Sequence, residues 1–209
     1  MKYTASALLI IDVQNDFCPG GALAVPEGDE VIEPLNRLGK RFALAGGIVA
    51  ATADWHPPDH VSFAETQAGK SPGDILPGGD KILWPSHCVQ GSPGADFHKR
   101  LDLNPVRGIF RKGFRRTLDS YSAFFENDHK TPTGLDGFLK SLEVHSVFLG
   151  GLATDYCVLY AALDAVRLGY KTFVCTDAVR GVGYPAGSVE RAFADMRSAG
   201  VQLISGEDL

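Results

Sequence analysis

Six short apolar runs alternate with segments whose apolar residues recur at helical spacing, and this alternation constrains the fold more than any other feature. The runs are predicted strands at residues 7–13, 47–53, 107–111, 145–150, 171–176 and 201–205. The first, second, fourth and fifth are almost continuously apolar, which is typical of strands buried on both faces. Amphipathic helices are predicted at residues 29–45, 154–168 and 188–198. The order predicts an α/β protein with a mainly parallel six-stranded sheet and helices on both faces.

Length, charge and cysteine content narrow the class of protein. The 209 residues fit a single domain spanning 1–209, and the formal charge of −5 argues against nucleic-acid binding, which normally needs a basic excess. No apolar run approaches the roughly 20 residues that cross a bilayer, so we expect no membrane segment. The four cysteines lie far apart, and we expect reduced thiols in a cytoplasmic protein. Whether the chain forms a homo-oligomer is left open.

Polar side chains stand at the ends of several predicted strands, which is where ligands bind in an open α/β sheet. They are Asp12, Asp54, His56, Lys112 and Cys157, in chain order. The carboxyl ends of parallel strands all lie at the same edge of the sheet. The element order therefore predicts that these residues, although far apart in the chain, gather at one edge.

Cys157 lies just inside a predicted helix, where unpaired N–H groups and the positive end of the helix dipole favour the nucleophilic thiolate. Asp12 can take the thiol proton as a general base and later return it as a general acid. Lys112 can keep both groups ionised and stabilise an oxyanion. The structural alternative is a packed thiol beside an Asp12–Lys112 ion pair.

The segment Asp54-Trp55-His56 is a candidate metal motif, because residues two apart in an extended chain point to the same face. His87, in the Gly/Pro-rich loop at 69–94, is the best candidate for a third ligand, and His60 is a second option. One carboxylate and two imidazoles, completed by water, make an open site for Zn²⁺, Fe²⁺ or Mn²⁺. Such a short motif also arises by chance or as a surface hydrogen bond.

Three aromatic residues, Phe17, Trp84 and Tyr121, lie close in sequence to these positions. Aromatic side chains ordinarily pack in the core. A flat aromatic ligand, however, needs stacking faces on two sides and one polar end held in place. They are therefore candidates for substrate binding.

The motifs together resemble those of the nicotinamidase family within the isochorismatase-like cysteine hydrolases. The matching segments are residues 11–17, 54–63, 84–91, 111–113, 119–124 and 151–157. The resemblance implies an isochorismatase-like, Rossmann-like three-layer sandwich. It also implies an amidase that converts nicotinamide to nicotinate and ammonia through a thioester, in salvage of NAD, and that also accepts pyrazinamide.

The resemblance assigns roles to individual residues. It implies a triad in which Cys157 is the nucleophile, Asp12 the proton shuttle and Lys112 the third member. The backbone N–H groups of Ala153 and Cys157 would form the oxyanion hole. A non-proline cis peptide is expected within 152–154.

For the metal site, the resemblance implies one divalent ion, with zinc the first expectation, held by Asp54, His56, His87 and water. His60 is left open as a further ligand. Ser62 and Glu65 are expected to support the ligands from behind.

Several alternatives stay open at the level of sequence. A sibling amidase acting on another small amide or ureide, an isochorismatase that cleaves an ether, and a non-catalytic thiol sensor each fit part of the pattern. The remaining cysteines, Cys18, Cys88 and Cys175, are expected to be packing residues. His98, His129 and His145 are expected on the surface or in loops.

Overall fold

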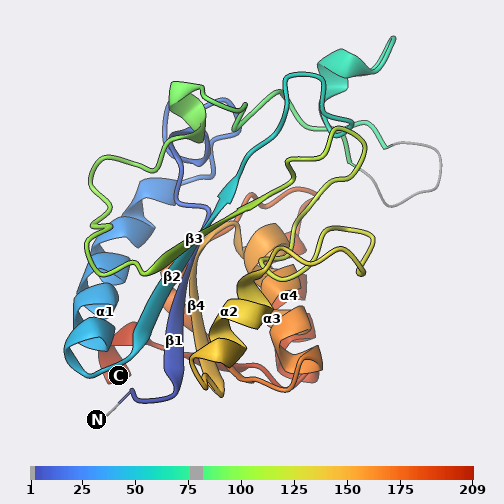
Figure 1. The fold of residues 1–209 in the computed structure, drawn as a ribbon. Coiled ribbons are helices and arrows are strands. Elements are labelled where there is room, and N and C mark those ends of the chain that lie inside the picture. The colour runs from blue at the N-terminus through green and yellow to red at the C-terminus, as the bar shows by residue number, and fades with distance from the viewer. Residues whose placement is uncertain (1–2, 76–81) are drawn as a thin grey trace.

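The computed structural model describes residues 3–75 and 82–209, which fold around one parallel sheet (Figure 1). The sheet order is β3-β2-β1-β4-β5-β6, and all neighbouring strands run parallel. The strands are β1 Ser6–Ile11, β2 Ile48–Asp54, β3 Gly108–Lys112, β4 Ser146–Leu152, β5 Lys171–Arg180 and β6 Gln202–Ile204. The predicted α/β class and the six-stranded parallel sheet are confirmed.

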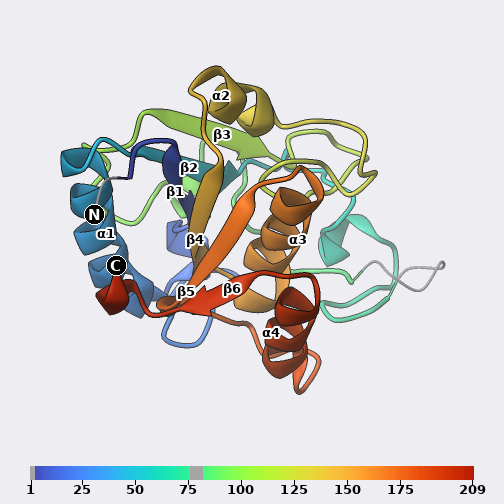
Figure 2. The ribbon, with the colours of Figure 1, turned by 90° about the horizontal axis from the view of Figure 1, so that it is seen from below.

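Helices cover both faces of the sheet, as Figure 2 shows from below. They are α1 Ile32–Leu44, α2 Leu135–Ser141, α3 Leu159–Arg167 and α4 Ser188–Ser198. Alternate residues of β1 supply two separate cores: Leu8 and Ile10 pack on the side of α1, while Leu9 and Ile11 pack on the side of the other three helices. Burial on both faces explains why this strand reads as continuously apolar.

The predicted elements differ from the observed ones mainly at their ends. The helix predicted at 188–198 is α4, with the same bounds. The helix predicted at 154–168 opens as a π-turn, Thr154–Val158, before α3 begins, and the one predicted at 29–45 opens as a 3-10 turn, Gly28–Val31, before α1. The sequence analysis missed α2, a seven-residue helix preceded by Gly134, which has a positive φ of 100°.

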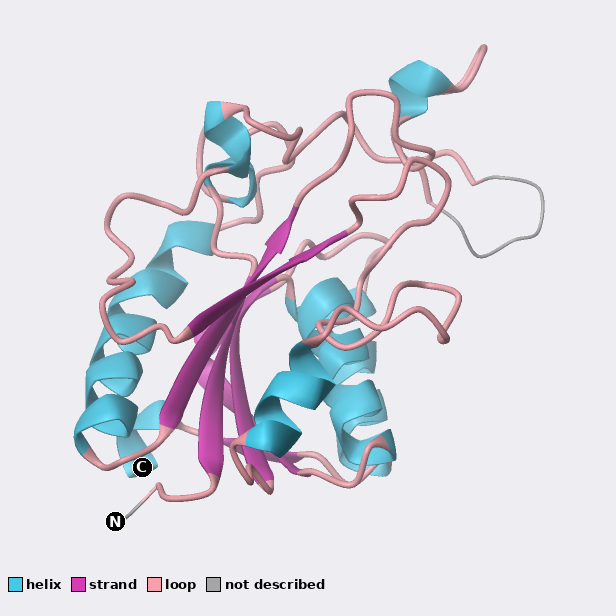
Figure 3. Cartoon of the chain, in the orientation of Figure 1, coloured by secondary structure: helices cyan, strands magenta, loops and turns pink. Residues whose placement is uncertain are grey.

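Loops gather beyond the carboxyl ends of the strands, in the upper half of Figure 3, while the helices that flank the sheet lie below them. The loops that follow β1, β2 and β3 meet there, so segments distant in the chain become neighbours (Figure 1). Within residues 3–75 and 82–209, no helix combines the length and the apolar composition needed to cross a membrane.

Candidate active site

Lys112, the last residue of β3, is a fully buried ammonium that joins two carboxylates and a thiol. Its Nζ lies 2.9 Å from Asp12 Oδ2, 2.5 Å from Asp54 Oδ1 and 3.4 Å from Cys157 Sγ. Burial alone would lower the pKa of Lys112. The two carboxylates raise the pKa by more than burial lowers it, so it lies well above its ordinary value. The lysine therefore stays charged and holds the predicted triad together.

Asp12 follows β1 directly and is completely buried. Its backbone has a positive φ of 48°, an uncommon conformation for a residue with a side chain, which turns the chain sharply after the strand. Thr52 Oγ1 donates a 2.6 Å hydrogen bond to Asp12 Oδ1. Burial raises the pKa of Asp12, and the opposing effects of Lys112 and Thr52 do not cancel it. Asp12 is thus a carboxylate with an enhanced affinity for a proton.

Cys157 lies in the π-turn Thr154–Val158 and its side chain lines the same site. The thiol is a hydrogen-bond partner of Asp12, and burial raises its pKa well above the ordinary value although Lys112 opposes the shift. Lys112 and the helix end favour the thiolate predicted from the sequence, whereas burial favours the thiol. Because burial opposes ionisation, nucleophilic attack by the sulfur needs a base that accepts the thiol proton, and Asp12 is placed to act as one.

Asp54, His56 and His87 offer three ligand atoms within 4.8 Å of one another. The Nε2 atoms of His56 and His87 lie 3.7 and 4.0 Å from Asp54 Oδ2, while their Nδ1 atoms lie 2.8 Å from the carbonyl oxygens of Gly113 and Pro85. Each Nδ1–H can donate to its carbonyl, which leaves the Nε2 lone pair directed to the shared centre. Burial lowers the pKa of His87 to about 4, so this imidazole is neutral, as a ligand must be.

The predicted supporting residues lie around this group. His60 stacks on His56 with ring centroids 4.2 Å apart, and its Nδ1 lies 2.7 Å from Ser62 Oγ. Its Nε2 lies 3.2 Å from a backbone carbonyl oxygen, so both ring nitrogens have protein partners. Glu65 accepts a 3.0 Å hydrogen bond from Ser86, the residue before His87.

Asp119 and Gln14 are among the residues of the site that were not predicted from the sequence. Asp119 lines the cavity and lies within ligand reach of His56 and His60. Gln14 is fully buried and holds Asp54 by its backbone: the side chain accepts from the N–H of Asp54 and donates to its carbonyl oxygen, both at 2.8 Å. The only sequence signal for Gln14 was a polar residue soon after a buried strand.

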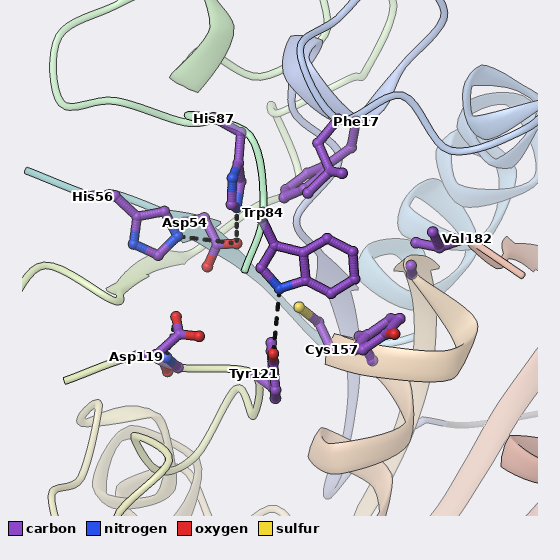
Figure 4. Close-up of a pocket in the computed structure, with 13 residues that line it drawn as sticks. Phe17, Asp54, His56, Trp84, His87, Asp119, Tyr121, Cys157 and Val182 are labelled. Atoms are coloured by element: carbon purple, nitrogen blue, oxygen red, sulfur yellow. Dashed lines mark hydrogen bonds and ion pairs between the residues drawn. The ribbon is translucent and has the colours of Figure 1, made fainter. Parts of the chain in front are cut away.

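Asp54, His56, His87 and Cys157 line one cavity, shown in Figure 4. The three predicted aromatic residues all line it, as does Ala153 beside Cys157. Trp84 Nε1 donates a 3.3 Å hydrogen bond to the hydroxyl of Tyr121. The cavity therefore combines flat apolar walls with a buried nucleophile and a potential cation site.

The expectations for the other cysteines, the cis peptide and three of the histidines are confirmed. Cys18, Cys88 and Cys175 are buried, and Cys157 is the single cysteine among the described residues that line the cavity. The expected non-proline cis peptide joins Leu152 to Ala153. His129 and His145 are exposed, and His98 is half-buried in a loop.

Replacing Thr52 with valine should move the acid limb of the pH profile of kcat/KM upwards. The Thr52 hydroxyl bonds to the Asp12 carboxylate and so lowers its pKa. Loss of a hydrogen bond to a charged group is worth about 1.5–3 kcal/mol, which corresponds to a rise of roughly one to two pH units. The matched control is Thr172→Val, because Thr172 is also buried but bonds to the carbonyl of Tyr170, away from the site. An unshifted acid limb in the Thr52 variant would mean that the limb does not report Asp12.

Comparisons with known proteins agree with this geometry. The model of the isochorismatase domain matches residues 6–208. A nicotinamidase of Acinetobacter baylyi is 45% identical, covering 97% of this chain and 94% of that protein. A solved nicotinamidase and pyrazinamidase of Acinetobacter baumanii superposes with a TM-score of 0.93 at 45% identity, covering 98% of each chain. A zinc complex of the pyrazinamidase of Pyrococcus horikoshii superposes with a TM-score of 0.81 at 36% identity, covering 96% of this chain and 99% of that one. The chain belongs to the isochorismatase family.

Proposed function

We propose that this protein is a nicotinamidase, an amidohydrolase that converts nicotinamide to nicotinate and ammonia and also accepts pyrazinamide. The observation that carries the proposal is that Lys112 joins Asp12 to Asp54 and Cys157, two residues that line one aromatic-lined cavity. The high identity to nicotinamidases over almost the whole chain supports this substrate.

In the proposed reaction, Asp12 takes the proton of the Cys157 thiol and the thiolate attacks the amide carbon. The N–H groups of Ala153 and Cys157 receive the oxyanion, and Lys112 keeps the surrounding charges balanced. Asp12 then gives its proton to the departing amine, so that ammonia leaves a thioester. Asp12 next takes a proton from water, whose oxygen attacks the thioester, and returns it to sulfur as nicotinate is released.

Asp54, His56 and His87 would hold one divalent metal ion, which we propose is zinc. One carboxylate and two imidazoles suit zinc as well as iron or manganese, and a zinc complex is known for the Pyrococcus horikoshii relative. When bound, the metal would supply a Lewis acid for the pyridine nitrogen. Phe17, Trp84 and Tyr121 would hold the ring.

The direct test is ammonia release from nicotinamide by the purified protein, with and without a chelator, and with metal content measured on the same sample. We expect release that the chelator suppresses and about one zinc ion for each chain. Absence of ammonia release from nicotinamide, together with release from another small amide or ureide, would instead identify a sibling amidase.

Replacing His87 with alanine should weaken metal binding by at least about 100-fold, because loss even of groups that support a ligand costs 10–100-fold. Metal content after dialysis against a graded chelator measures the loss. His98→Ala is the matched control, since His98 is half-buried outside the cavity. Full metal retention by the His87 variant would remove this residue from the ligand set.

We further propose that the reaction serves the salvage of NAD in the cytoplasm. The four cysteines are free thiols, which supports a reducing compartment. Fractionation of cells that produce the protein, with nicotinamidase activity measured in each fraction, tests the location.

A further inference from the structure

The cavity is divided into a polar side and an aliphatic side. Its acidic and imidazole groups belong to the candidate metal cluster and to Asp119, whereas its aliphatic lining comes from Leu23, Ala153 and Val182. Val182 is half-buried and lies in the loop between β5 and α4. Figure 4 shows it across the cavity from His56 and Asp54, beyond Cys157.

The backbone of Val182 is fixed by a side chain from the turn that carries Cys157. Asp155 is buried and accepts hydrogen bonds from the N–H groups of Val182 and Gly183, both at 2.9 Å, and from Ser188 Oγ at 2.5 Å. The charged acceptor makes these bonds stronger than neutral ones. Displacing Val182 from the cavity would therefore strip a buried carboxylate of its donors.

The next residue in this turn, Tyr156, adds a second attachment. The Tyr156 hydroxyl donates a 2.5 Å hydrogen bond to the carbonyl oxygen of Tyr184, two residues after Val182. Tyr156 itself lines the cavity and packs edge-on against Trp84 with ring centroids 5.0 Å apart. The loop is thus tied to the turn of the nucleophile at Val182 and at the two residues that follow it, which holds this wall in place.

We propose that Val182 is a specificity-determining residue that excludes substituents on the ring edge opposite the pyridine nitrogen. The inference rests on the proposed function, in which that nitrogen faces Asp54 and its histidines while the carboxamide faces Cys157. The remote edge of the ring, carbons 4 and 5, then faces Val182. The substrates accepted are six-membered heteroaromatic carboxamides that are bare at this edge.

The test compares kcat/KM for 5-methylnicotinamide with that for nicotinamide in the unmodified protein and in Val182→Ala. One extra methyl group against a fixed apolar wall is worth about tenfold or more in kcat/KM. We therefore expect kcat/KM of the unmodified enzyme to be lower for 5-methylnicotinamide than for nicotinamide by at least this factor. In Val182→Ala most of this difference in kcat/KM should disappear. The ratio for 6-methylnicotinamide, whose substituent adjoins the ring nitrogen, should not change.

Val106→Ala is the matched control, because Val106 is also half-buried and packs against the same core cluster as Val182 but does not line the cavity. A second readout is the Kd of 5-methylnicotinamide by calorimetry in Cys157→Ala, with and without Val182→Ala, where no turnover occurs. Unchanged ratios and Kd values in the Val182 variants, or equal gains from Val106→Ala, would overturn the proposal. Failure of the proposed function would show separately, as absence of ammonia release from nicotinamide by the unmodified protein.

Discussion

Cys157→Ala should lower kcat for ammonia release by about 10⁴-fold or more, the largest effect expected of any single change in the chain. Loss of a nucleophile that acts as one unit with its base removes nearly all of the acceleration that the set provides. The change leaves the aromatic residues of the cavity and the group Asp54, His56 and His87 in place. Metal content and the affinity for nicotinate should therefore be close to those of the unmodified protein. Ammonia release, calorimetry and metal analysis on the same sample measure all three.

Cys175→Ala is the control for loss of a buried thiol, because Cys175 lies in β5 and is fully buried outside the cavity. Burial raises its pKa to about 12, so it has no nucleophilic form near neutral pH. This variant should keep its activity apart from a small loss of stability. A Cys157 variant that retained more than about a hundredth of the original kcat would contradict the covalent route.

The parts of the fold that the sequence predicts are those with strong local patterns. The continuously apolar strands and the amphipathic α4 were located because burial on one or both faces leaves a periodic record. The short helix α2 leaves little such record, since Gly137 interrupts its seven residues. Its position depends instead on Leu135 and Leu139, which are buried against the sheet.

The convergence of the triad and the candidate metal ligands was predictable because strand order alone brings strand ends to one edge. The supporting roles of Gln14 and Asp155 were not predictable, because their hydrogen-bond partners lie 40 and about 30 positions away in the chain. No local sequence pattern indicates these contacts. The effect of burial on the Cys157 thiol was not predictable for the same reason. Its burial among carboxylates is a property of the assembled site and not of the helix end that carries it.

Replacing Lys112 with methionine should lower the free energy of unfolding at neutral pH by about 3–5 kcal/mol, because it leaves buried carboxylates without their counter-charge. Lys112 is fully buried and pairs with Asp12 and Asp54, whose side chains are also buried. Urea unfolding of the purified proteins, followed by fluorescence, measures the difference. Lys140→Met is the control: Lys140 pairs with Asp136 on the exposed face of α2, and such a pair is worth about 0.5 kcal/mol or less.

The pH dependence of this deficit identifies its cause. Without the ammonium, the pKa of Asp12 should rise further above its ordinary value of 3.8, and that of Asp54 should no longer be held below it. A folded state with raised carboxyl pKa values binds protons more tightly than the unfolded chain, so the variant should gain stability as the pH falls towards 4. In the unmodified protein, the effect of Asp54 on stability has the opposite pH dependence. Its lowered pKa stabilises the fold above pH 3.8, and this contribution is lost as the pH falls below 3.8. Between pH 7 and pH 4 only the raised pKa values of the variant act, and they make the deficit largest near neutrality and smaller near pH 4. A deficit that is the same at pH 4 and pH 7 would mean that lost packing of the lysine stem, rather than unpaired charge, destabilises the variant.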